Sequence, residues 1–141
     1  MPLLYFPYIC MNKISIAPEN LVIGANRELK ILEIREKSVL GVDYLGGMFE
    51  VNIEDLKGSP IDEAFLNADG FSQRSITTKQ GKLVDYIKQI KTLDGKFLTI
   101  SILPIAFGWE IEIKDEQFQV ICTGKNIKHK HTYQNLVAAY V

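Results

Sequence analysis

The stretch Ile127-Lys-His-Lys-His-Thr-Tyr-Gln-Asn-Leu-Val-Ala-Ala-Tyr-Val141 changes character partway along. It begins as an alternating basic strand end. It then places apolar residues at i, i+3, i+4 and i+7, which are Tyr133, Leu136, Val137 and Tyr140. That spacing predicts an amphipathic helix with one apolar stripe. Because such a stripe has to be covered, we expect the upstream chain to supply a β-sheet on which this helix lies.

Strand signals dominate the first half of the chain. Val39–Tyr44 and Met48–Ile53 flank Leu45-Gly46-Gly47, and this pattern predicts a β-hairpin whose turn uses glycine. Glu28–Glu36 is ambiguous, since its charges also suit a helix. We favour a strand because a β-branched pair lies inside it and only strands follow closely. These segments predict a small antiparallel sheet.

The segment Ser59-Pro60-Ile61-Asp62 predicts the start of a helix. A serine cap followed by proline at the first helical position is typical of such a start, and Asp62 complements the positive helix end. Gly70 ends the pattern. The apolar stripe of this helix is Ile61, Ala64, Phe65 and Ala68.

The second half of the chain again predicts strands. Phe71–Gln80 is polar and reads as a loop. Lys82–Lys91 fits either a strand or a short helix, and the Asp94-Gly95 turn signal after it favours a strand. Gly108–Lys114 alternates cleanly, as do Phe118, Val120 and Cys122 in the following segment.

The fold class predicted from these segments is α+β in a single domain over residues 18–141. A first antiparallel sheet spans about 28–56, a linking helix 60–69, a second antiparallel sheet about 82–130, and a C-terminal helix 132–141 covers that second sheet. Residues 1–17 form an apolar extension or arm. Met11 is an alternative start. Met1–Met11 lacks a basic start and is too short to span a bilayer, so we predict neither a signal peptide nor a membrane anchor.

Charge is unevenly distributed although the formal net charge is only −1. Residues 1–70 carry 6 basic and 11 acidic side chains, whereas residues 71–141 carry 10 and 6. The acidic half argues against general nucleic-acid binding, and the basic half suits a small anionic ligand or an acidic partner. Cys10 and Cys122 lie far apart without a C-x-x-C motif, which predicts free thiols in a reducing compartment.

Two motifs resemble a family of small proteins encoded by bacteriophages, prophages and mobile elements of gut-type bacteria. The family segment P-L-T-E-E-W-L-L-x-x-G-F appears here as the run from Pro60 to Phe71. Its C-terminal segment I-K-Y-V-H-Q-L-Q-N-L-Y-F-A-L appears from Ile127 to Leu136, with threonine after His131 where glutamine is usual. The resemblance implies a phage source and the cytoplasm of an infected bacterial host. It assigns no activity.

The candidate functional residues are mostly basic. His129 and His131 form an H-x-H pair, but no further ligand signature accompanies them, so we predict no metal and no cofactor. His131 either closes the strand-to-helix corner by hydrogen bonding or faces a ligand. Lys125, Lys128 and Lys130 stand beside the start of the last helix, an arrangement that suits a phosphate or carboxylate as well as a solvated rim.

Trp109 and Arg74 each have two interpretations. Trp109 is a core residue or a stacking platform for a base. Arg74 lies in the polar stretch and either closes over an anionic ligand or stays free at the surface. Tyr133 lies on the helix stripe. No nucleophile–base–orienter set is present, so we predict that the protein is not an enzyme.

Two functions follow as expectations. The first, which the family resemblance implies, is a homo-oligomeric protein that binds and sequesters a small nucleotide-like host immune signal; its candidate binding residues are Arg74, Trp109, Lys125, Lys128, His129, His131 and Tyr133. The alternative is a protein-interaction module that contacts a host or phage protein through its apolar and acidic N-terminal half.

Overall fold

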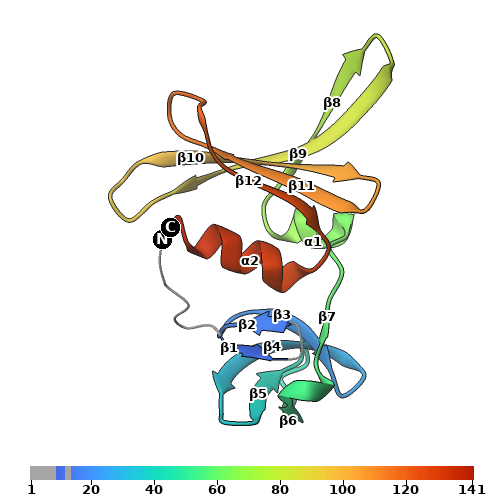
Figure 1. Ribbon diagram of the computed structural model, residues 1–141, viewed down its shortest axis with the longest axis vertical. Helices are drawn as coiled ribbons and strands as arrows, with labels where there is room; N and C mark the ends of the chain where they lie inside the picture. Colours follow the sequence, from blue (N-terminus) through green and yellow to red (C-terminus); the bar gives the residue numbers. More distant parts are fainter. Residues whose placement is uncertain (1–8, 12–13) are drawn as a thin grey trace. The chain divides into compact units, whose positions relative to one another are not determined.

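The computed structural model describes residues 9–11 and 14–141. Its contacts divide the chain into two compact units, one comprising Met1–Pro60 and His129–Ala139, the other Ile61–Lys128 and Tyr140–Val141. Each unit is built on its own five-stranded antiparallel sheet (Figure 1). The fold is α+β in the broad sense, with sheets far outweighing the two helices. The arm predicted for residues 1–17 falls mostly on 1–8 and 12–13, which lie outside the described residues.

The sheet of the first unit has the strand order β6-β5-β4-β3-β7. A separate two-stranded ladder pairs β1 with β2, and a 3-10 turn, η1, connects β6 to β7. The hairpin predicted around Leu45-Gly46-Gly47 is confirmed as β5–β6. The elements are β1 (Ile9–Met11), β2 (Ile14–Ile16), β3 (Leu21–Gly24), β4 (Arg27–Ile34), β5 (Ser38–Val42), β6 (Met48–Asn52), η1 (Ile53–Asp55) and β7 (Lys57–Gly58).

Strand β4 shows why the ambiguous segment is extended. Leu29 and Ile31 are fully buried, whereas Glu28 and Lys30, which precede each of them, are exposed. This alternation has the period of two that a half-buried strand requires. These two side chains join a core formed by Ile16, Val22, Leu29, Ile31, Val39, Val51, Ile53 and Leu56.

The C-terminal helix α2 (Lys130–Ala138) packs on β2 and β3 of the first unit. We expected it to cover the second sheet. Its polar residues explain the difference: the Gln134 side chain accepts a hydrogen bond from the Leu21 backbone at 2.9 Å, and Asn135 accepts one from Asn20 at 2.8 Å. The apolar stripe alone indicated that the helix is covered. These two amide side chains bind it to the first unit.

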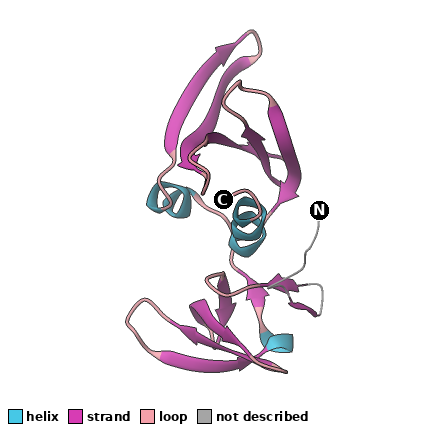
Figure 2. Cartoon of the chain, turned by 90° about the vertical axis from the view of Figure 1, so that its left-hand side faces the viewer, coloured by secondary structure: helices cyan, strands magenta, loops and turns pink. Residues whose placement is uncertain are grey.

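The sheet of the second unit is a meander with the order β12-β11-β10-β9-β8. Its buried face carries Ile100 and Ile102 of β10 beside Ile111 and Ile113 of β11, all fully buried. Figure 2 shows how strands dominate both units. The strands are β8 (Ser72–Thr78), β9 (Gly81–Lys91), β10 (Phe97–Ile105), β11 (Gly108–Lys114) and β12 (Val120–Ile127).

The polar stretch 71–80 is a strand, not the loop that its composition predicts. Strand β8 pairs with β9 from Ser72 opposite Ile87 to Thr78 opposite Gly81. Its hydroxyl and amide side chains are compatible with an exposed strand, so polarity alone did not distinguish the two states. The favoured strand at 82–91 is confirmed as β9.

Helix α1 (Glu63–Ala68) begins later than its sequence predicts. Asp62 is the N-cap, and its carboxylate accepts a hydrogen bond from the Phe65 backbone at 2.8 Å. The predicted first turn is extended because Pro60 pairs with His129 and the Ile61 N–H donates to the Lys128 carbonyl at 3.1 Å. Among the described residues, no helix is long and apolar enough to cross a membrane.

Candidate functional site

The residues predicted to bind a ligand are divided between the two units. His129, His131 and Tyr133 belong to the first unit, and Arg74, Trp109, Lys125 and Lys128 to the second. Neither unit therefore contains the whole predicted set.

Arg74 is bound to a carboxylate of its own sheet. Its guanidinium donates two hydrogen bonds to Asp85 on β9, at 3.0 and 2.7 Å. These bonds and the charge of Asp85 raise the pKa of Arg74. Asp85 is buried, so the guanidinium compensates a charge that would otherwise be unpaired. Arg74 accordingly clamps the β8–β9 hairpin at the point where β10 no longer pairs with β9.

Trp109 makes an aromatic contact within the second unit. Its ring meets that of Tyr86 edge-on, with centroids 6.0 Å apart and an interplanar angle of 66°. Tyr86 is buried, and burial is the main cause that raises its pKa. This contact supports the interpretation of Trp109 as a core residue.

Lys125 and Lys128 are both exposed at the end of β12. Lys125 lies in a bulge, because Trp109 pairs with Ile127 and Ile111 pairs with Gly124, leaving two residues opposite one. The second bulge residue, Asn126, has a φ of 58°. The bulge gives Lys125 a defined place at the edge of the sheet.

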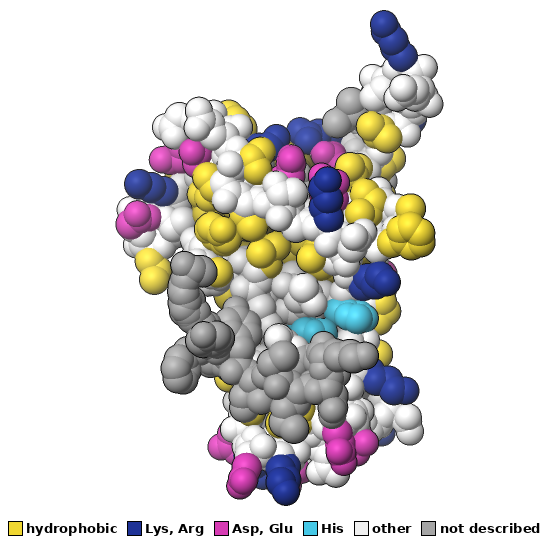
Figure 3. All heavy atoms as spheres, in the orientation of Figure 1, with side chains coloured by type: hydrophobic (Ala, Val, Ile, Leu, Met, Phe, Trp, Pro, Cys, Tyr) yellow, Lys and Arg dark blue, Asp and Glu magenta, His cyan; other side chains and the backbone are white. Residues whose placement is uncertain are grey.

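The two histidines stack at the strand-to-helix corner of the first unit. Their rings are 5.6 Å apart and nearly parallel, and Figure 3 shows the pair side by side in cyan. His131 is 4% exposed, and its Nδ1 has no hydrogen-bond partner in the described part of the chain. Burial, followed by the charge of His129, lowers the pKa of His131 to about 4. His131 is therefore neutral at pH 7 and contributes no positive charge to an anion site.

Lys130 lies between these histidines in the sequence, and its side chain is buried. Its Nζ lies 2.6 Å from the Glu28 carboxylate of β4. The Ser59 hydroxyl donates to the same carboxylate oxygen. The cation next to the helix start is thus engaged by a carboxylate. The sequence carried no signal for this pair, since Glu28 and Lys130 are 102 residues apart.

A second group of residues, the Asp43 turn, joins β5 to β6. We use this name for residues 43–47. The Asp43 carboxylate accepts hydrogen bonds from the Leu45 and Gly47 backbones at 3.1 and 2.8 Å, and from Arg27 at 3.1 Å. The Gly47 backbone bond is the main cause that lowers the pKa of Asp43. Gly46 has a φ of 89°, which glycine adopts without strain. The turn is consequently fixed by its own side chain.

The Asp43 turn holds large apolar side chains out in solvent. Tyr44 is 93% exposed and Leu45 is 76% exposed, and Met48 at the start of β6 is exposed as well. Exposed apolar residues are ordinary when they occur singly, but a group of them on a fixed turn marks a candidate binding surface. The sequence predicted the turn from its glycines, and the pair of large apolar residues before Gly46-Gly47 was the signal that we did not use.

A hollow of about 540 Å³ adjoins the Asp43 turn in the first unit. Its wall combines apolar stems with both signs of charge, and each charged residue has an ion-pair partner. The lining residues are Leu21, Arg27, Glu28, Lys30, Val42, Asp43, Tyr44 and Leu45. None of the seven residues predicted to bind a ligand is among them.

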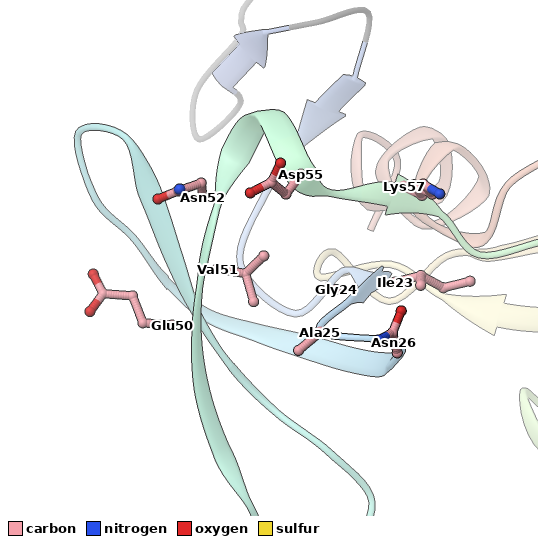
Figure 4. Close-up of a pocket in the computed structure, with 9 residues that line it drawn as sticks. All are labelled: Ile23, Gly24, Ala25, Asn26, Glu50, Val51, Asn52, Asp55 and Lys57. Atoms are coloured by element: carbon pink, nitrogen blue, oxygen red, sulfur yellow. The ribbon is translucent and has the colours of Figure 1, made fainter.

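A second hollow of about 460 Å³ lies between the β3–β4 turn and the segment around η1 (Figure 4). Its wall is polar, with Asn26, Asn52, Asp55 and Lys57 around Val51. Figure 4 shows these side chains reaching it from the two segments on either side. This hollow also contains none of the predicted site residues.

Two hairpins of the second unit repeat the geometry of the Asp43 turn. These turns are residues 92–96 and 115–119. In each, the N–H of the first residue donates to the carbonyl of the fifth residue, and the N–H of the fourth residue donates to the carbonyl of the first. The fourth residue has a positive φ each time: 89° at Gly46, 85° at Gly95 and 60° at Phe118. Phe118 thus occupies a position that favours glycine, while its side chain is 73% exposed.

Comparison with known proteins identifies no relative: no family model, curated protein or solved structure matches the chain.

Proposed function

We propose that this chain is a non-enzymatic protein-interaction module whose first unit binds a partner protein through the Asp43 turn and the adjoining hollow. The observation that carries the proposal is the near-complete exposure of Tyr44 and Leu45 on a turn locked by Asp43. Tyrosine is one of the residue types that most often dominate the energy of protein interfaces.

The locked turn is important because ordering costs free energy. A flexible loop loses about 0.5–1.5 kcal/mol for each rotamer-rich side chain that binding immobilises, in addition to its backbone entropy. The Asp43 carboxylate accepts hydrogen bonds from the Leu45 and Gly47 backbones, which order the turn before any partner arrives, and Arg27 holds the carboxylate in place. Preorganisation of this kind leaves more of the apolar burial available as affinity.

Leu93, on a turn of the same geometry, supports the choice by contrast. Leu93 is 97% exposed on the equivalent turn 92–96, but its neighbours on that turn are polar or glycine. The Asp43 turn combines adjacent apolar side chains with a hollow that has room for a partner side chain. We therefore place the partner at the first unit.

Sequestration of an anionic signal, the other function expected from the sequence, lacks such an observation. Arg74 and Lys130 are each bound to a carboxylate, and His131 is neutral at pH 7. An anion site built on them would have to break existing ion pairs, and this cost favours the interaction function.

Affinity enrichment with matched variants tests the proposal. The tagged protein, the Tyr44→Ser/Leu45→Ser variant and the Leu93→Ser variant are compared in cells of the source organism by quantitative mass spectrometry. We expect a protein that is enriched at least tenfold with the parent chain and with Leu93→Ser, and lost with the Tyr44/Leu45 variant. Equal recovery with all three chains, or loss with Leu93→Ser alone, would contradict the proposal. Circular dichroism shows whether each variant remains folded.

A further inference from the structure

The strand-to-helix corner of the first unit contains groups that the interaction function does not use. Here the chain leaves the first unit after Pro60 and re-enters it at His129. The two passages pair with each other through a Pro60–His129 bridge, and the Lys130 N–H donates to the Ser59 carbonyl at 2.8 Å. The first turn of α2 is closed by the Tyr133 N–H, which donates to the His129 carbonyl at 3.3 Å.

The imidazole of His131 is sealed into this corner. The ring is buried, Nδ1 has no partner within the described residues, and the neighbouring His129 ring stacks on it. A neutral imidazole has one N–H donor and one acceptor, whereas the protonated ring has two donors and a full charge. A second N–H would have no acceptor here. Burial accordingly lowers the pKa of His131 to about 4.

The charged groups around His131 do not offset a second cation. On α2 itself, Lys130 is buried and adds a positive charge beside it. From β4, the Glu28 carboxylate already accepts bonds from Lys130 and Ser59. Of the charged residues that flank the two passages in the sequence, Lys57 and Lys128 are also cationic, and the Asp62 carboxylate accepts a hydrogen bond from the Phe65 backbone. Protonation of His131 in the closed corner would therefore bury an uncompensated charge, which is strongly unfavourable.

We propose that this corner is a proton-operated latch: uptake of a proton by His131 releases the pairing of Ser59–Pro60 with His129–Lys130 and opens the first turn of α2. The physical reason is that the charged ring gains hydration only when the corner opens. Local opening of a few hydrogen bonds costs less than global unfolding, so it is the first response to acid. The latch goes beyond the proposed interaction function and does not depend on it.

Site-resolved amide hydrogen exchange tests the latch in the full chain. Protection factors, corrected for the intrinsic effect of pH, are measured at pH 7 and pH 5 for the Lys130 and Tyr133 amides. The Ile31 amide, which donates to the Asn20 carbonyl at 2.9 Å in the same unit, is the internal reference. We expect protection of the two latch amides to fall at least tenfold at pH 5 while that of Ile31 changes less than twofold. Unchanged protection of the Lys130 and Tyr133 amides, or an equal fall in protection at all three amides, would overturn the proposal.

Two variants and one titration identify the sensor. The His131→Leu variant is expected to keep high protection of the Lys130 amide at pH 5, whereas His129→Leu is expected to retain the acid-induced loss. If His129→Leu abolishes the acid-induced loss of protection and His131→Leu retains it, the proton is taken up by His129. That result would overturn the proposal. In the parent protein, the NMR titration of the His131 ring is expected to have its midpoint below pH 5.5. A midpoint near 6.5 would overturn the proposal even if His131→Leu fails to fold.

Discussion

The His129 imidazole lies directly over the Cα of Gly58, so that a Cβ at residue 58 would stand 2.4 Å from the ring Cγ. Real Cβ atoms do not approach a ring so closely, and the imidazole cannot retreat while it stacks on His131. Glycine at this position is thus a steric requirement of the corner, not a matter of backbone freedom.

The first prediction concerns this contact. Gly58→Ala should destabilise the protein by about 1–3 kcal/mol, the usual cost of an added methyl group in a packed site. The measurement is urea unfolding at pH 7. The matched control is the same change in a His129→Ala background, where the obstructing ring is gone. We expect the cost there to fall below about 0.5 kcal/mol, and an equal cost in both backgrounds would refute the steric explanation.

Asp43 provides the second prediction, which is a pH dependence. Its folded pKa is below its ordinary value of 3.8, because backbone hydrogen bonds and Arg27 favour the carboxylate. A depressed carboxyl pKa stabilises the fold above the unfolded pKa, and this stabilisation is lost as the pH falls through the folded pKa. The parent should therefore be more stable than Asp43→Ala at pH 7, with a smaller difference near pH 3. A difference that grows on acidification would contradict the role given to this carboxylate.

Phe118 leads to the third prediction. Because it holds a φ of 60° where the two equivalent turns have glycine, Phe118→Gly should relieve strain and stabilise the protein by about 1 kcal/mol. The control is Gly95→Ala on the turn 92–96, which should destabilise for the same reason in reverse. Thermal unfolding measures both. Destabilisation by Phe118→Gly would mean that the phenyl ring makes contacts worth more than the strain.

The fourth prediction separates a clamping ion pair from a superficial one. Arg74→Ala leaves the buried Asp85 without its cation and should cost about 1–2 kcal/mol, a figure reduced because Arg74 itself is half exposed. Arg35→Ala is the control, since Arg35 and its partners Glu33 and Glu50 are all exposed, and we expect it to destabilise the protein less than Arg74→Ala does. Equal costs in urea unfolding would show that the clamp has no special role.

Sequence periodicity predicted the elements whose apolar residues face one core. Leu29 and Ile31 alternate because one side of β4 is buried, and the hairpin at Gly46-Gly47 needs a positive φ. Strand β8 was missed because most of its described side chains are polar and exposed and so leave no apolar pattern. What identifies β8 as a strand is its pairing with β9, and a short stretch of sequence considered alone does not show this pairing.

Long-range pairing also explains the other differences. Ser59-Pro60 has the composition of a helix start, but its backbone pairs with residues 128–130, and the helix begins only at Glu63. The basic tail predicted an anion site because the sequence does not reveal that Glu28 neutralises Lys130. Conversely, the exposure of Tyr44 and Leu45 depends on which face of the hairpin the core covers, and this is a property of the folded sheet.

The most direct test of the interaction function is site-specific photo-crosslinking from position 44. Replacing Tyr44 by p-benzoylphenylalanine keeps an aromatic ring on the Asp43 turn, and the same replacement of Leu93 serves as the exposed control. Illumination in cells of the source organism should give one discrete adduct with a partner protein from position 44 and none from position 93. No adduct from position 44, or the same adducts from both positions, would contradict the assignment of this turn as the binding surface.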